Sequence, residues 1–109
     1  MTTTGGDRDE EALRLVAGVA RVAIFGEVDA ATAGRLDDAL TACAPDPAVE
    51  LVVDCRGLEF IDSSGLNVFV KNAERLEAAG GRLVLESPRA SARRLFEIAG
   101  LDRIVTIRQ

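Results

Sequence analysis

Histidine is absent from the 109-residue chain, and so are tyrosine and tryptophan. Histidine is the commonest general base and the commonest transition-metal ligand, so its absence excludes every Ser–His nucleophile pair and every histidine-based metal site. Catalysis would have to depend on carboxylates, Lys71 or two thiols. We therefore expect a binding protein and not an enzyme, with no cofactor and no metal.

Long apolar runs are also missing, since none approaches the 18 or so residues that a membrane-spanning helix needs. The net charge is −5, and no basic stripe interleaved with aromatic residues is visible. These features argue against membrane and nucleic-acid partners. Residues 1–10 are polar and contain no apolar stretch, so we expect a disordered tail there and not a signal peptide.

Cysteine is scarce, with only Cys43 and Cys55 in the chain. Two cysteines are too few for a disulfide framework, and their spacing fits no metal site. A reduced, cytoplasmic compartment is the default for such a chain. We expect both thiols to be buried as small apolar side chains, the alternative being a redox-sensitive pair.

What the chain does contain is alternating strand and helix patterns over residues 11–109, which predict one domain. The predicted strands are 12–17, 20–25, 49–55, 82–86 and 104–107, and the predicted helices are 30–42, 63–79 and 88–98. The order β-β-α-β-α-β-α-β predicts an α/β fold with a mixed β-sheet, antiparallel at the first hairpin and parallel afterwards.

Three local signals refine this prediction. Asp29 precedes the first helix and is a typical N-cap residue. Arg56-Gly57 is typical of a turn after the third strand. The spacing of apolar residues places the phenylalanines in the core, and these are Phe25, Phe60, Phe69 and Phe96.

The segment LEFIDSSGLNVFV, residues 58–70, joins the third strand to the longest helix. Asp62 or Ser63 is expected to cap that helix. A nucleophilic serine is the sharper alternative, but the GxSxG spacing and an activating histidine are both missing, which argues against it. A metal site formed by Asp54, Glu59 and Asp62 lacks the ligand spacing of a known oxygen cage.

Regulatory phosphorylation is a further possibility at Ser63. A phosphate there would add about −1.5 to −2 charges. The free N–H groups and the dipole of a helix N-terminus would tolerate this charge, so we expect the fold to survive. A protein docked over the turn would be displaced, because the new charge would lie beside Asp62.

Two motifs, GEVDAATAGRLDDAL at 26–40 and LEFIDSSGLNVFV at 58–70, together with SARRLFEIAGLDRIV at 91–105, resemble a free-standing STAS domain of the anti-sigma factor antagonist family. The resemblance implies a STAS-type single domain with helices on one side of the sheet. It also implies a partner, an anti-sigma factor that is a serine kinase of the histidine-kinase-like ATPase fold. A PP2C-type phosphatase would reverse the phosphorylation.

The family motif D-S-[ST]-G implies a role for each residue that it matches here. Ser63 corresponds to the phosphorylated serine, and Ser64 to the neighbouring hydroxyl. Asp62 matches the acid of the motif, and Gly65 its glycine. Asp29, in the GEVD segment, matches an aspartate that lies near the phosphorylation site and the partner surface in the family.

One position departs from the family pattern, because Asn67 stands where the family often has glycine. Asn67 is expected on the partner surface, where it would tune partner choice. STAS domains also occur in stressosomes and in lipid-transport complexes. A subunit of such an assembly, without a phosphorylation cycle, is therefore the alternative function.

Overall fold

The computed structural model describes residues 12–109, so the expected tail, residues 1–10, lies outside the described residues. The five strands are β1 (Leu13–Gly18), β2 (Arg21–Val28), β3 (Glu50–Ile61), β4 (Arg82–Glu86) and β5 (Thr106–Arg108). The helices are α2 (Ala33–Cys43), α3 (Ser63–Ala78) and α4 (Ala90–Ile98), followed by a 3-10 turn, η1 (Leu101–Arg103). This arrangement confirms the predicted element order and the mixed α/β fold.

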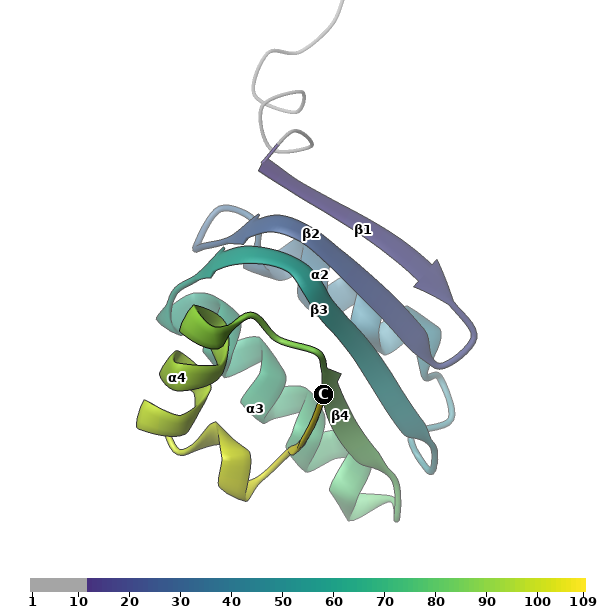
Figure 1. The fold of residues 1–109 in the computed structure, drawn as a ribbon. Helices are drawn as coiled ribbons and strands as arrows, with labels where there is room; N and C mark the ends of the chain where they lie inside the picture. Colours follow the sequence, from purple (N-terminus) through teal and green to yellow (C-terminus); the bar gives the residue numbers. More distant parts are fainter. Residues whose placement is uncertain (1–11) are drawn as a thin grey trace, which may run out of the picture.

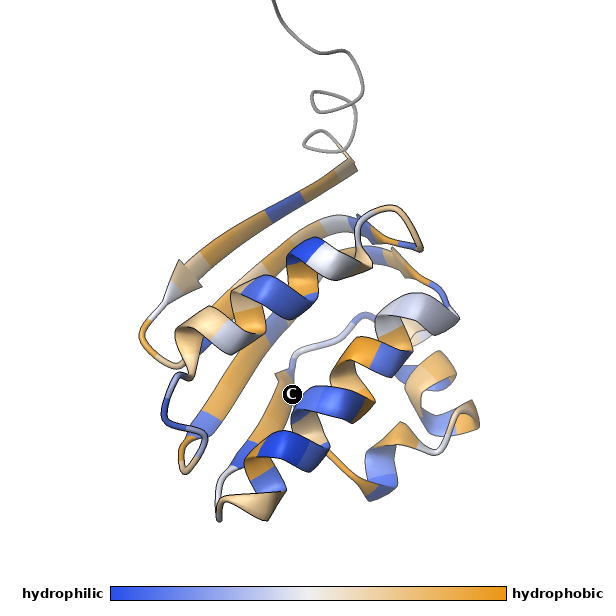
Figure 2. Cartoon of the chain, turned by 180° about the vertical axis from the view of Figure 1, so that it is seen from behind, coloured by the Kyte–Doolittle hydropathy of each residue, from blue (hydrophilic) through white to orange (hydrophobic). Residues whose placement is uncertain are grey.

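The strands form one sheet in the order β1-β2-β3-β4-β5. β1 pairs with β2 in antiparallel register, and the remaining neighbours are parallel. α2 and α3 lie behind this sheet (Figure 1), and polar and apolar residues alternate along both helices (Figure 2). Their buried residues include Leu36 and Leu40 of α2 and Phe69 and Leu76 of α3. The layer between sheet and helices holds the core, because a half-covered sheet must bury its apolar face.

β3 is longer than predicted, and Arg56-Gly57 does not turn the chain. The strand continues to Ile61, with two register shifts against β2 that each insert one extra residue. A Cβ atom on Gly57 would lie 2.5 Å from Cδ1 of Phe25, so glycine allows that ring to lie against the strand. The turn-like composition therefore marks a β-bulge, which bends a strand without ending it.

The starts of two helices also differ from the prediction. α2 begins at Ala33 with Thr32 as its N-cap, so Asp29 does not cap this helix. α4 begins at Ala90, later than the Ser87-Pro88 signal indicates, with Arg89 as its N-cap. No side-chain hydrogen bond caps either helix.

Only two of the four phenylalanines lie in the core. Phe69 of α3 and Phe96 of α4 are fully buried and pack edge to face, with ring centroids 6.0 Å apart. Phe25 and Phe60 are wrongly predicted as core residues, since 36% and 51% of their surfaces are exposed. Phe25 alternates with the buried Ile24 of β2 and so lies on the opposite face of the sheet, whereas the bulges of β3 shift the alternation around Phe60.

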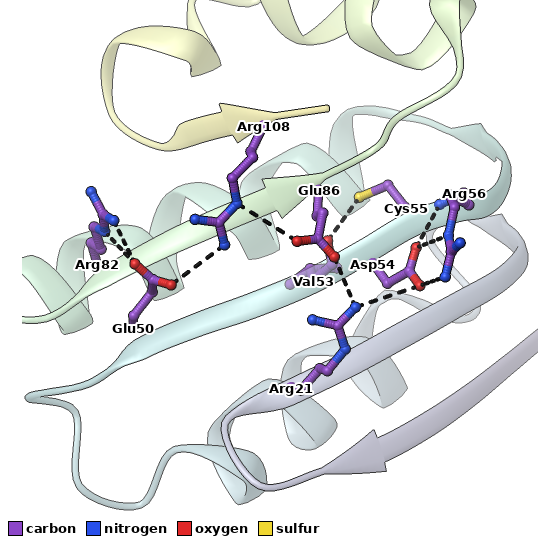
Figure 3. Close-up of polar contacts among 9 residues, drawn as sticks. All are labelled: Arg21, Glu50, Val53, Asp54, Cys55, Arg56, Arg82, Glu86 and Arg108. Atoms are coloured by element: carbon purple, nitrogen blue, oxygen red, sulfur yellow. Dashed lines mark hydrogen bonds and ion pairs between the residues drawn. The ribbon is translucent and has the colours of Figure 1, made fainter.

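A chain of seven alternating charges crosses the face of the sheet that α2 and α3 leave uncovered (Figure 3). Each of its three carboxylates lies between two arginines. We call this the arginine–carboxylate chain, and its members in order are Arg82, Glu50, Arg108, Glu86, Arg21, Asp54 and Arg56. It joins β2, β3, β4 and β5 across the sheet.

Candidate functional site

Two turns lie side by side where β2 and β3 end. Val28 pairs with Ile61 at the last register position of the two strands. The Asp62 N–H then donates to the Val28 carbonyl at 3.1 Å. The turn that follows β2 and starts with Asp29 is therefore fixed next to the turn that starts α3, as expected when parallel strands end at one edge of a sheet.

Asp62 is the N-cap of α3, as the sequence predicts. Its Oδ1 atom accepts hydrogen bonds from the backbone N–H of Ser64 at 2.9 Å and of Gly65 at 3.4 Å. The Leu66 N–H donates to the Asp62 carbonyl at 3.0 Å. These bonds satisfy donors that a helix start otherwise leaves without partners, and they hold the first turn in place.

Ser63 is exposed in the first turn of α3, whereas Ser64 is half-buried. The Ser63 hydroxyl makes no hydrogen bond with any residue in the described range. The N–H groups of Ser64 and Gly65 were expected to be free for a phosphate. In the structure both already donate hydrogen bonds to the Asp62 carboxylate. An anion on Ser63 would therefore face solvent and the Asp62 carboxylate, with little help from the helix N-terminus.

Asp29 is half-buried, and its carboxylate organises its own turn. Its Oδ1 atom accepts from the N–H groups of Ala31 at 3.0 Å and Thr32 at 3.2 Å, and from the Thr32 hydroxyl at 3.1 Å. In return, the Asp29 N–H donates to the Thr32 hydroxyl at 3.0 Å. Thr32 is a residue of this site that was not predicted, although Asp-x-x-Thr before a helix is a recognisable capping pattern.

Gly65 and Asn67 have different surroundings on the same helix. Gly65 is buried, and an added Cβ would lie 2.5 Å from Ile61 Cγ1 and 2.8 Å from Val28 Cγ1. Glycine therefore lets α3 start close against the ends of both strands. Asn67 is exposed one turn after Ser63, and residues four apart share a helix face.

Other candidate chemistry finds no site in the structure. Among residues 12–109, no group of three or more Cys, Asp or Glu side chains is placed to hold a metal ion. Asp54 is instead paired with Arg56, whose hydrogen bonds lower the pKa of this carboxyl. Burial raises the pKa of the Cys55 thiol to about 12, so Cys55 is an unreactive core residue. Cys43 is half-buried.

None of the helices within residues 12–109 is long and apolar enough to cross a membrane.

Comparison with known proteins places nearly all of the described range in one family. A family model described as the Mlab, STAS domain matches residues 12–106. The anti-sigma-B factor antagonist of Bacillus subtilis is 36% identical over 87 residues, which are 80% of this chain and 79% of that protein. The anti-sigma-B factor antagonist of Listeria monocytogenes is 35% identical over 85 residues, 78% of this chain and 75% of that protein.

Solved structures agree with the sequence relatives. An anti-sigma factor antagonist from Mycobacterium paratuberculosis superposes with a TM-score of 0.72 at 27% identity, covering 88% of this chain and 83% of that one. The Bacillus cell fate determinant SpoIIAA in its phosphorylated form has a TM-score of 0.62 at 27% identity, covering 88% and 90%. The chain belongs to the STAS-domain family of anti-sigma factor antagonists.

Proposed function

We propose that this chain is an anti-sigma factor antagonist that is switched off by phosphorylation of Ser63. In its unphosphorylated form it binds an anti-sigma factor that is also a serine kinase of the histidine-kinase-like ATPase fold, and a sigma factor is released. A PP2C-type phosphatase restores the binding form. The cycle runs in the cytoplasm, and this chain has no catalytic role in it.

The observation that carries the proposal is the exposed Ser63 hydroxyl beside the Asp62 carboxylate. A phosphate would bring about −1.5 to −2 charges to within one residue of an existing negative charge. Because the hydroxyl bonds to no described residue, its modification breaks no contact of the fold. Repulsion therefore acts on a protein docked over the turn, and α3 stays capped by Asp62.

The partner surface in this proposal consists of the two neighbouring turns and the first exposed positions of α3. Asp29 and Asp62 fix the turns through their hydrogen bonds, and Gly65 seats the helix against the strands. Ser64 is half-buried beneath the surface, and Asn67 extends it along the helix. The related SpoIIAA has a similar fold, and its structure has been solved in the phosphorylated form. This supports the proposal that a phosphate leaves the fold intact.

The test is phosphorylation of the purified chain by the anti-sigma factor kinases encoded in its own genome, followed by site mapping with mass spectrometry. We expect one phosphate, on Ser63. Ser63→Ala should remain unmodified and keep binding the kinase in the presence of ATP. Ser63→Asp should bind roughly tenfold more weakly or worse, because it adds a charge where the phosphate would stand.

Ser64→Ala is the matched control, since it removes the adjacent hydroxyl and should still be phosphorylated on Ser63. Modification of Ser64 or of another residue, or no modification by any of these kinases, contradicts the proposal. If Ser63→Asp and the wild type co-purify equally with a large particle or a membrane ATPase, the alternative function as an assembly subunit replaces it.

A further inference from the structure

A small groove lies next to the Ser63 turn, where β3 extends beyond its neighbour β4. β4 ends at Glu86, opposite Asp54, and the remaining part of β3 runs alongside α4. The groove between them encloses about 120 Å³, close to the roughly 150 Å³ that holds a benzene-sized group. Its lining residues are Glu59, Phe60 and Ile61 of β3, and Ser91, Ala92 and Leu95 of α4.

The groove is suited to an apolar side chain. Phe60 forms part of its wall and leaves 51% of its surface exposed, which is uncommon for a phenylalanine. Among the six lining residues Glu59 alone is charged. Glu59 is the extra residue of the second bulge of β3, and bulges commonly redirect a side chain at a functional site.

The acids near the groove differ from the other acids of the sheet. Glu50, Asp54 and Glu86 are all paired with arginines. Glu27 and Glu59 are exposed, and neither side chain has an ion pair or hydrogen bond with a residue of the described range. A partner with lysine or arginine beside an apolar residue would be complementary to this edge.

The groove lies close to Ser63 along the chain. Ile61, which lines the groove, is two residues before Ser63, so about 7 Å of chain separates them. A protein interface of ordinary size covers about 800 Å² on each partner, so one docked protein spans both features.

We propose that the groove receives an apolar side chain of the same anti-sigma factor that docks over Ser63, and that a basic residue of this partner pairs with Glu59. This inference rests on the proposed function and adds a second anchor to it. Phosphorylation acts on the Ser63 part of the interface, whereas the groove contributes affinity that no charge on Ser63 removes directly.

The experiment measures the dissociation constant of the anti-sigma factor kinase for the full chain and its variants. Phe60→Ser removes one wall of the groove, and Ser91→Trp fills it without removing a buried group. Each should weaken binding about tenfold or more, as expected for a residue that anchors an interface. Glu59→Lys should weaken binding at low salt, with a smaller difference at high salt.

Ile98→Ser is the matched control, because Ile98 lies on the same helix, is 73% exposed and does not line the groove. It should bind like the wild type, and thermal unfolding should show that all variants are folded. If Ser63→Asp weakens binding while Phe60→Ser and Ser91→Trp bind like the wild type, the groove proposal is overturned and the proposed function stands.

Two further outcomes also count against the groove proposal. If the wild type binds no anti-sigma factor, the proposed function and the groove proposal fail together. If the groove variants change only the self-association of the chain in analytical ultracentrifugation, the groove belongs to a second copy of the chain and not to the anti-sigma factor.

Discussion

The two ends of the sheet treat their charges in opposite ways. Along the first half of β3, the arginine–carboxylate chain pairs each of its carboxylates with two arginines (Figure 3). At the other end, Glu27 and Glu59 have no ion pair with a described residue, and Phe60 is half-exposed. The Phe25 ring is partly covered, because the Arg14 guanidinium lies 4.4 Å from its centroid. The charged groups of the first region pair with one another within the fold, whereas the second region leaves acidic and apolar side chains exposed to solvent.

The residues that pair within the fold are therefore different from those that we propose contact a partner. Exposed ion pairs contribute about 0–1 kcal/mol each, so the arginine–carboxylate chain mainly orders the open face and neutralises it. Glu27 and Glu59 are solvated and stabilise the domain little, and Phe60 leaves half of its surface open to a partner. The site at the ends of β2 and β3 thus depends on rigid turns and not on charge pairing.

The largest expected effect comes from Gly65→Ala, which disrupts the close packing of α3 against the ends of β2 and β3. The new Cβ would lie 2.5 Å from Ile61 Cγ1, so α3 or the strand ends must shift. Overpacking of this kind costs about 1–3 kcal/mol. Urea unfolding should show this loss, and binding of the anti-sigma factor should weaken because Ser63 moves with the helix.

Gly34→Ala is the matched control, since Gly34 is an exposed position within α2 and nothing lies within 4 Å of an added Cβ. Replacing a helical glycine with alanine stabilises by about 0.5–1 kcal/mol. The two substitutions should therefore change the free energy of unfolding in opposite directions. An unchanged or increased stability of Gly65→Ala would contradict the close packing of α3.

A smaller effect is expected from Asp62→Ala, which removes the acceptor for the Ser64 and Gly65 N–H groups. Loss of an N-cap costs about 1 kcal/mol, within a range of about 0.5–2 kcal/mol. Asp62→Asn keeps an oxygen at the same place and should retain most of the stability. Urea unfolding of the two variants separates the cap from the charge, and an equal loss in both would assign the effect to the charge.

The cap at Asp62 and the fold around it could be predicted because they depend on local patterns. The Asp-Ser-Ser-Gly sequence directly precedes a long helical repeat, and α3 begins where that repeat predicts. The strand 82–86 is short, has an apolar centre and lies between Gly81 and Ser87-Pro88, and β4 has the same bounds. In both cases the neighbours in sequence determine the structure.

Other features depend on contacts between distant segments. Arg56-Gly57 has the composition of a turn, and only pairing with β2 turns it into a bulge. Asn72 has a polar side chain but is 1% exposed, because its Nδ2 donates to Asp37 of α2 at 2.9 Å. Periodicity along one helix cannot identify such a partner. The exposed Phe60 has the same origin, since the bulges of β3 decide which face it occupies.

The smallest expected effect tests the arginine–carboxylate chain, through the pH dependence of the free energy of unfolding. Asp54 is 7% exposed and accepts two side-chain hydrogen bonds from Arg56, at 3.1 and 2.8 Å. These bonds lower its pKa in the folded state below the ordinary value of 3.8. The stabilisation is therefore fully present above that value, and it is lost as the pH falls through the lower, folded-state pKa.

Asp54→Asn should lower the free energy of unfolding by about 0.5 kcal/mol at neutral pH, because solvent around the exposed Arg56 side chain screens the ion pair. The difference from the wild type should shrink below about pH 4, where the wild-type carboxylate also begins to lose its charge in the unfolded chain. Arg56→Gln removes the same pair from the other side, and the double variant should lose less than the sum of the two. Strictly additive losses, or a difference that stays constant down to low pH, would show that the arginine–carboxylate chain does not stabilise the sheet through this pair.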